Sequence, residues 1–185
     1  MTVRVVLVAP VTGQVARFGD EMPDAAALRR AEAAAGALPA FVRAYSAPEA
    51  RCRATVDALG VHAVPATELG DLDVGRWRGR ELDDVAADEP EAMAAWLSDP
   101  EAAPHGGEAL PALVARAAGW LASQAEAGGR VLAVVPPAVV RAAVIGALGL
   151  SPAVFWRLDV PPLTATELTG RAGRWNWRCG RALRA

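Results

Sequence analysis

Two short runs of apolar residues, each ended by proline, form the clearest pattern in the sequence. Residues 3–9 are mostly β-branched and stop at Pro10, and residues 130–135 repeat this arrangement before Pro136 and Pro137. Because proline has no N–H to donate to a β-ladder, each run predicts a buried strand that ends at its proline. Ligands of open α/β sheets bind beyond the carboxyl ends of the strands, so we expect both prolines to face one crevice.

The remaining hydrophobic pattern alternates between helical and strand-like segments. Strands are predicted at 41–46, 62–66, 153–160, 164–169 and 174–178, and helices at 24–35, 48–59, 81–87, 90–97, 108–127 and 138–148. This alternation favours a three-layer α/β fold with a mostly parallel central sheet, helices on both faces and an antiparallel strand near the C-terminus. No linker or repeat divides the sequence, so we expect residues 1–185 to form a single domain.

Composition excludes several classes of function. Of the 185 residues, 53% are hydrophobic, which is enough for a sizeable core, and the formal net charge is −2. All 19 basic residues are arginine, so lysine Schiff-base chemistry and a P-loop lysine are excluded. The arginines are scattered along the sequence and only 5% of the residues are aromatic, so no nucleic-acid partner is expected.

The cysteines and histidines are too few and too dispersed to suggest a metal centre. Cys52 and Cys179 lie far apart, which favours a reduced, cytoplasmic protein. The histidines are His62 and His105, so a histidine-rich metal site is excluded, and we expect no metal or cofactor. The N-terminal apolar run is too short for a signal peptide or a membrane span, so no membrane association is expected. The sequence leaves the oligomeric state open, including a dimer.

Five segments, in order along the chain, resemble motifs of one protein family. Residues 44–55 resemble Ser-Ser-Pro-Leu-x-Arg-Ala-x-Gln-Thr, and residues 69–79 resemble Leu-x-Glu-x-Asp-Phe-Gly-x-Trp-Glu-Gly. Residues 96–100 resemble Trp-x-x-Asp-Pro, residues 104–108 resemble Pro-Gly-Gly-Glu-Ser, and residues 130–150 resemble the strand and helix of Ser/Thr-His-Gly-Gly-Val-Ile-Arg-Ala. On these segments the sequence is identified as a member of the histidine phosphatase superfamily, with the phosphoglycerate-mutase-like fold, and is most similar to its small bacterial phosphatases.

The resemblance also shows where this sequence departs from the family's catalytic pattern. The first strand of the family ends in Arg-His-Gly, with a histidine nucleophile, whereas this sequence has Ala9, Pro10 and Val11 there. The second family histidine, which holds the transferring oxygens, is replaced by Pro136. Of the four groups at the centre of the family's phosphate pocket, only Arg51 remains. Without its nucleophile, the protein is not expected to act as a phosphatase or mutase by the family mechanism.

The groups that remain are compatible with two functions. Asp71 matches the family glutamate that acts as a general acid, and Arg51 could bind a carboxylate or another anionic group. In the first hypothesis, a pseudophosphatase binds a small organic ligand or a protein partner in the old active-site crevice. In the second, Asp71 and Arg51, helped by His105, perform acid–base chemistry on a more apolar substrate, as an isomerase, cyclase, lyase or hydrolase.

The residues expected to bind a ligand surround the two strand ends. They are Ala9, Pro10, Val11, Thr12, Gln14, Arg51, Trp77, Glu108, Pro136 and Pro137. Structural roles remain open for the candidate catalytic groups: Asp71 as a loop carboxylate bonded to backbone amides, Arg51 as a partner in a structural ion pair, and His105 as a turn residue. The apolar floor made by the prolines and their neighbours disfavours a bare phosphate in either hypothesis.

Overall fold

The computed structural model describes residues 2–13 and 17–183, and this part of the chain contains a six-stranded mixed sheet in the order β3-β2-β4-β1-β5-β6. The strands are β1 (Thr2–Val8), β2 (Arg43–Ser46), β3 (Val64–Pro65), β4 (Gly129–Val134), β5 (Thr164–Arg171) and β6 (Arg174–Ala182). Strand β4 pairs in parallel with β1 and β2, and β2 pairs in parallel with β3. Strand β5 pairs antiparallel with both β1 and β6. The mostly parallel sheet with an antiparallel C-terminal part is therefore confirmed.

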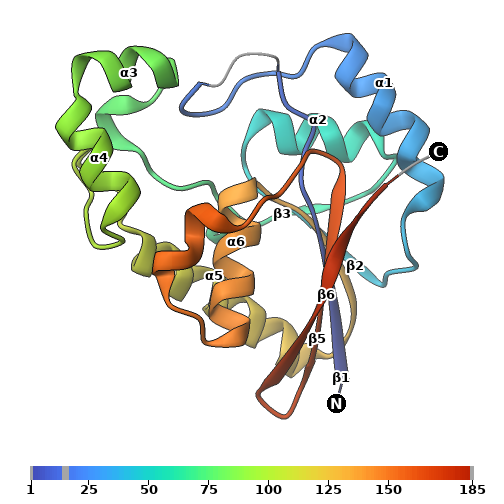
Figure 1. The fold of residues 1–185 in the computed structure, drawn as a ribbon. Coiled ribbons are helices and arrows are strands. Elements are labelled where there is room, and N and C mark those ends of the chain that lie inside the picture. The colour runs from blue at the N-terminus through green and yellow to red at the C-terminus, as the bar shows by residue number, and fades with distance from the viewer. Residues whose placement is uncertain (1, 14–16, 184–185) are drawn as a thin grey trace.

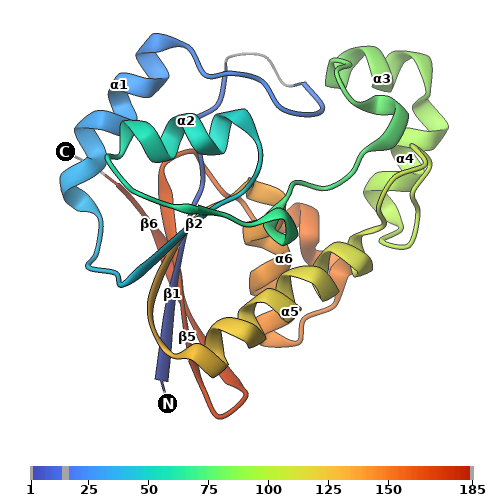
Figure 2. The ribbon, with the colours of Figure 1, turned by 180° about the vertical axis from the view of Figure 1, so that it is seen from behind.

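Helices cover both faces of this sheet. The α-helices are α1 (Ala25–Ala34), α2 (Ala50–Ala58), α3 (Leu82–Asp88), α4 (Pro90–Ser98), α5 (Leu110–Ala127) and α6 (Pro137–Leu148), and short 3₁₀ helices are η1 (Ala35–Ala37), η2 (Thr67–Leu69), η3 (Gly75–Trp77) and η4 (Pro152–Arg157). Helices α1 and α2 lie on one side of the sheet and α5 and α6 on the other, while α3 and α4 stand apart from it (Figure 1). The reverse view in Figure 2 shows the same layers. No helix of the described residues is long and apolar enough to cross a bilayer.

The apolar runs recognised in the sequence form the centre of the core. In β1, Val3, Val5 and Val8 have no exposed surface, because β4 and β5 flank this strand and helices cover it. Helices α5 and α6 pack closely at Gly146, where a Cβ atom would lie 3.0 Å from the Cβ of Ala118. This close packing fixes the position of α6 against α5.

Residues 153–160 differ from the prediction, because they contain the 3₁₀ helix η4 and no strand. Pro152 occupies the first turn of η4, and the Ser151 hydroxyl accepts a hydrogen bond from the Ala153 N–H at 3.3 Å. Phe155 is fully buried, and the Trp156 ring lies 4.3 Å from that of Trp96. A short apolar run fits a strand or a buried helical turn equally well, so periodicity alone gave the wrong element. The strand predicted at 62–66 is shortened to the two residues of β3.

Five arginines gather on one face of the sheet near β5 and β6. Residues paired directly across neighbouring strands point to the same face, and the pairs Arg4–Arg130, Arg171–Arg174 and Glu167–Arg178 therefore define this surface. All five arginines are exposed: Arg4, Arg130, Arg171, Arg174 and Arg178. Glu167 lies between two of them, with carboxylate oxygens 3.0 Å from Arg4 Nε and 3.6 Å from an Arg178 terminal nitrogen. We call this surface the arginine face.

Candidate functional site

The first and fourth strands end side by side, so the two prolines that follow them lie at the same edge of the sheet. Val8 pairs with Val134, and the next N–H along β4, that of Val135, donates to the Val8 carbonyl at 3.0 Å. Pro10 and Pro136 are both buried. Ala9, immediately before Pro10, is also fully buried, so this edge of the sheet is apolar.

The chain after Pro10 is tied to helix α2 through a buried hydroxyl. The Thr55 Oγ1 accepts a hydrogen bond from the Val11 N–H at 3.1 Å and donates to the Arg51 carbonyl at 2.7 Å. Thr55 and Val11 have no exposed surface, and Thr12 is half-buried. Gln14, expected among the ligand-binding residues, lies outside the described residues.

Arg51 is held by acidic and carbonyl groups on several sides. Its guanidinium forms an ion pair with the Asp71 carboxylate and donates to the Gly19 carbonyl at 2.7 Å. Its backbone N–H donates to Asp20 Oδ1 at 3.1 Å, and the other Asp20 oxygen accepts from the Ala50 N–H, so Asp20 supports the start of α2. The structure thus brings the predicted pair Arg51 and Asp71 together, with the charge of the arginine already matched by a carboxylate.

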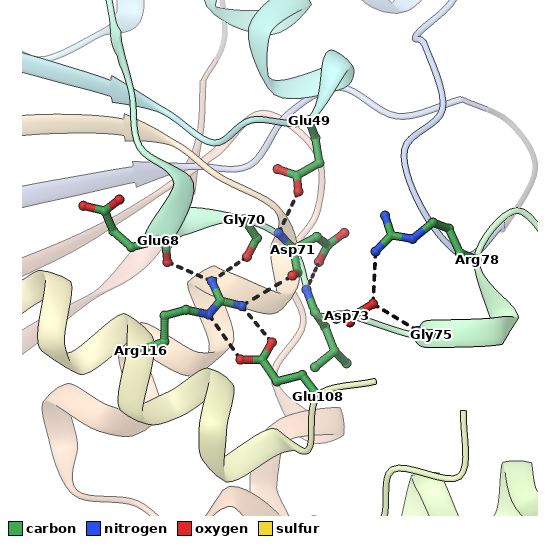
Figure 3. A network of polar contacts seen from close by, with 10 residues as sticks. Glu49, Glu68, Gly70, Asp71, Asp73, Gly75, Arg78, Glu108 and Arg116 are labelled. Atoms are coloured by element: carbon green, nitrogen blue, oxygen red, sulfur yellow. Dashed lines mark hydrogen bonds and ion pairs between the residues drawn. The ribbon is translucent and has the colours of Figure 1, made fainter. Parts of the chain in front are cut away.

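Two carboxyl groups lie beside this arginine in partly buried positions. Glu49 Oε1 accepts from the Asp71 N–H at 2.7 Å, and Asp71 Oδ1 accepts from the Leu72 N–H at 2.8 Å (Figure 3). Burial raises the pKa of Asp71 above its usual range, and the Arg51 guanidinium opposes that rise. Burial likewise raises the pKa of Glu49, although the hydrogen bond from Asp71 acts in the other direction. Both groups can therefore carry a proton closer to neutrality than ordinary surface carboxyls.

The loop that carries Asp71 is clamped by Arg116 of helix α5 (Figure 3). One terminal nitrogen of Arg116 donates to the carbonyl oxygens of Glu68 and Gly70, each at 2.8 Å. The Nε and the other terminal nitrogen reach the two oxygens of Glu108, at 3.2 Å and 2.8 Å. Glu108, predicted as a ligand-binding residue, is therefore the partner of this clamp, and the position of Asp71 depends on α5.

His105 and Trp77 lie inside an aromatic cluster with Trp96. The His105 and Trp77 ring centroids are 5.1 Å apart, and the two side chains are 1% and 0% exposed. His105 Nδ1 accepts from the Gly107 N–H at 3.0 Å, and burial lowers the pKa of the imidazole, which favours the neutral form. In the described residues no hydrogen bond joins His105 to Asp71 or Arg51. This placement is typical of a structural histidine.

Sequence reasoning missed several polar residues of this region, including Thr55, Asp20, Glu49 and Arg116. Glu49 could have been noticed, because it directly precedes the helix that carries Arg51. Asp20 belongs to a loop without a pattern, and Arg116 follows its partner Glu108 by eight residues, a spacing that predicts no contact within one helix. Among residues 2–13 and 17–183, no group of three or more His, Cys, Asp or Glu side chains is placed to hold a metal ion.

Solved structures similar to this chain include several phosphatases. The mycobacterial glucosyl-3-phosphoglycerate phosphatase is 22% identical, with a TM-score of 0.83 and complete coverage of both chains (100% each). A phosphoserine phosphatase variant from Entamoeba histolytica, in complex with phosphoserine, is 16% identical, with a TM-score of 0.83 and coverage of 96% of each chain. The α-ribazole phosphatase from Shigella flexneri is 18% identical, with a TM-score of 0.81 over 98% of this chain and 96% of that chain. At these identities the similarity shows the fold alone.

The family assignment comes from the sequence itself. No curated protein matches the chain. The family model of the histidine phosphatase superfamily (branch 1) matches residues 24–181, which is most of the sequence. It therefore agrees with the fold and with the five motifs, and the chain belongs to the histidine phosphatase superfamily.

Proposed function

We propose that this protein uses the histidine-phosphatase fold to bind a small organic ligand near Arg51 and Asp71, without transferring phosphoryl groups through a histidine. The observation that carries the proposal is the identity of the residues at the ends of β1 and β4, which are Pro10 and Pro136. The two histidines of the sequence lie elsewhere: His62 is exposed after α2, and His105 is buried in the aromatic cluster. A proline side chain can neither attack phosphorus nor donate a hydrogen bond to a phosphoryl oxygen.

The charge around Arg51 supports the same proposal. Phosphoryl transfer relies on positive charge placed around the transferring oxygens. Here Arg51 forms an ion pair with Asp71, Asp20 accepts from its backbone N–H, and Glu49 contacts the Asp71 backbone. The nearby Arg116 is paired with Glu108. The region therefore has little net positive charge with which to attract a phosphate dianion.

A ligand with a single carboxylate suits this arrangement better. Such a carboxylate could replace that of Asp71 as the partner of Arg51, provided that Asp71 takes up a proton. The raised pKa of Asp71 makes this proton uptake less costly than for an exposed aspartate. Pro137 and Thr12, both half-buried near the strand ends, would then contact the rest of the ligand.

Phosphate release and ligand binding test the two parts of the proposal. The wild-type protein should release no more inorganic phosphate from phosphoserine or from glucosyl-3-phosphoglycerate than the matched variant Pro10→Ala does. Release that disappears in Arg51→Met would contradict the proposal. Carboxylic acids that raise the melting temperature should lose this effect in Arg51→Met. Calorimetry in two buffers of different ionisation enthalpy should show about one proton taken up per ligand.

The alternative function is acid–base catalysis by Asp71, supported by its raised pKa and its contact with Arg51. In that case the wild-type protein should convert a bound compound into a product of different mass or retention time. Asp71→Asn should abolish this conversion and leave binding in place. A ligand that returns unchanged from the wild-type protein favours binding alone.

A further inference from the structure

Arg141 of helix α6 is a half-buried cation that forms no ion pair with the described residues. Its Nε donates to the Leu158 carbonyl at 2.7 Å, which fixes one edge of the guanidinium. Its Cζ lies 5.6 Å from the Phe155 ring centroid and 5.9 Å from that of Trp156, so aromatic rings flank the group. The side chain is thus held in place although no carboxylate neutralises it.

Burying a cation in this way is unfavourable unless another group compensates. Burial lowers the pKa of Arg141, and the charges of Asp159 and Asp71 oppose this from beyond ion-pair distance. Arg51 and Arg116, by contrast, each have a carboxylate in direct contact. A half-buried arginine whose terminal nitrogens contact no carboxylate of the described residues is the arrangement expected where an external anion completes the site.

Arg141 also lines a cavity of about 440 Å³ between α6, the segment after η4, and strands β5 and β6. This volume falls within the roughly 300–1,000 Å³ of small-molecule sites. Val140 and Val144 give it an apolar wall, and Trp177, 40% exposed, adds a flat aromatic surface. Thr166 is 6% exposed and also lines the cavity, to which it contributes a polar side chain.

We propose that this cavity binds a flat organic acid with one negative charge. The acid group would pair with the terminal nitrogens of Arg141, and the apolar body would lie against Val140, Val144 and the Trp177 ring. A single charge is inferred because the other charged groups lining the cavity, Arg157 and Asp159, are opposite in sign. The inference goes beyond the proposed function, since neither Arg51 nor Asp71 lines this cavity.

The aromatic sulfonate 8-anilinonaphthalene-1-sulfonate and its neutral analogue N-phenyl-1-naphthylamine test the proposal by fluorescence titration. The sulfonate should bind the wild-type protein, and Arg141→Met should weaken it at least about tenfold, as expected for a charge-assisted hydrogen bond. Binding of the neutral analogue should change less than about twofold. The control Arg29→Met removes an exposed arginine of α1 and should change neither affinity.

Two further variants keep the test decisive. Trp177→Leu alters an exposed side chain and should weaken both probes, even if Arg141→Met proves too unstable to measure. Arg51→Met should leave sulfonate binding unchanged, which separates this cavity from the ligand site near Asp71. Equal sulfonate affinity in the wild type and Arg141→Met, or no effect of Trp177→Leu, would overturn the proposal. Circular dichroism must show that each titrated variant is folded, because the sulfonate also binds partly unfolded chains.

Discussion

Replacing Arg116 by methionine should release the loop that carries Asp71. Methionine keeps an unbranched side chain of similar length and removes every hydrogen bond of the guanidinium. The lost bonds are those to the Glu68, Gly70 and Asp71 carbonyl oxygens and to both oxygens of Glu108. The Glu108 carboxylate, whose side chain is 17% exposed, would then remain without its cation.

The expected loss of stability follows from these contacts. Hydrogen bonds to a charged group contribute about 1.5–3 kcal/mol each when removed singly, but contacts of one guanidinium are not additive. The Arg116 side chain is 26% exposed, so solvent screens part of the interaction. We expect Arg116→Met to lower the free energy of unfolding by about 3 kcal/mol. For a domain of this size that corresponds to a fall in melting temperature of roughly 6–12 °C.

Urea denaturation of four proteins measures this coupling: the wild type, Arg116→Met, Glu108→Gln and the double variant. Glu108→Gln should lower the unfolding free energy by about 1 kcal/mol. The loss in the double variant should be about 1 kcal/mol smaller than the sum of the two single losses, since no unpaired carboxylate remains. Arg29→Met serves as the control for loss of an exposed arginine. A loss below about 1 kcal/mol for Arg116→Met, or strict additivity in the double variant, would refute the reasoning.

Three further substitutions probe the same region. Thr55→Val leaves the buried Val11 N–H without its acceptor and should lower the unfolding free energy by about 1–3 kcal/mol, measured in urea; an unchanged value would contradict the role of this hydroxyl. Glu49→Gln should raise the melting temperature near pH 7. Burial raises the pKa of Glu49, so the neutral carboxyl stabilises the fold at pH values below its ordinary pKa of 4.5. This stabilisation is lost as the pH rises through the raised pKa. The increase in melting temperature caused by Glu49→Gln should therefore vanish near pH 4. Gly107→Ala should lower the unfolding free energy by at least about 3 kcal/mol, since its Cβ would lie 2.0 Å from a backbone carbonyl oxygen. The control Gly106→Ala has open space around its Cβ and a φ of +77°, so it should lower the unfolding free energy by only about 1–2 kcal/mol.

The fold was accessible from the sequence because its central elements have strong local signals. The run at 3–9 and the proline at position 10 define β1, and Gly128 ends α5 directly before β4 begins at Gly129. The strand predicted at 153–160 was wrong, because the burial of Phe155 is decided by tertiary packing and not by periodicity.

The candidate site was accessible only in part. The five motifs pointed to Arg51 and Asp71, which the structure brings into contact. The same reasoning could not show that His105 turns into an aromatic cluster, because a glycine-rich loop leaves the direction of its side chains undetermined. It also could not find Arg116, whose contacts to a distant loop depend on how α5 packs.

The arginine face makes the distribution of charge over the molecule less even than its formal net charge of −2 suggests. Glu167 contacts two of its five exposed arginines, while exposed acids such as Asp83, Asp84 and Glu91 lie on α3 and α4 at the opposite end (Figure 1). The arginine face therefore has a local excess of positive charge that the net charge of the protein does not reveal. A negatively charged surface should therefore attract this face of the molecule even though the net charge is negative.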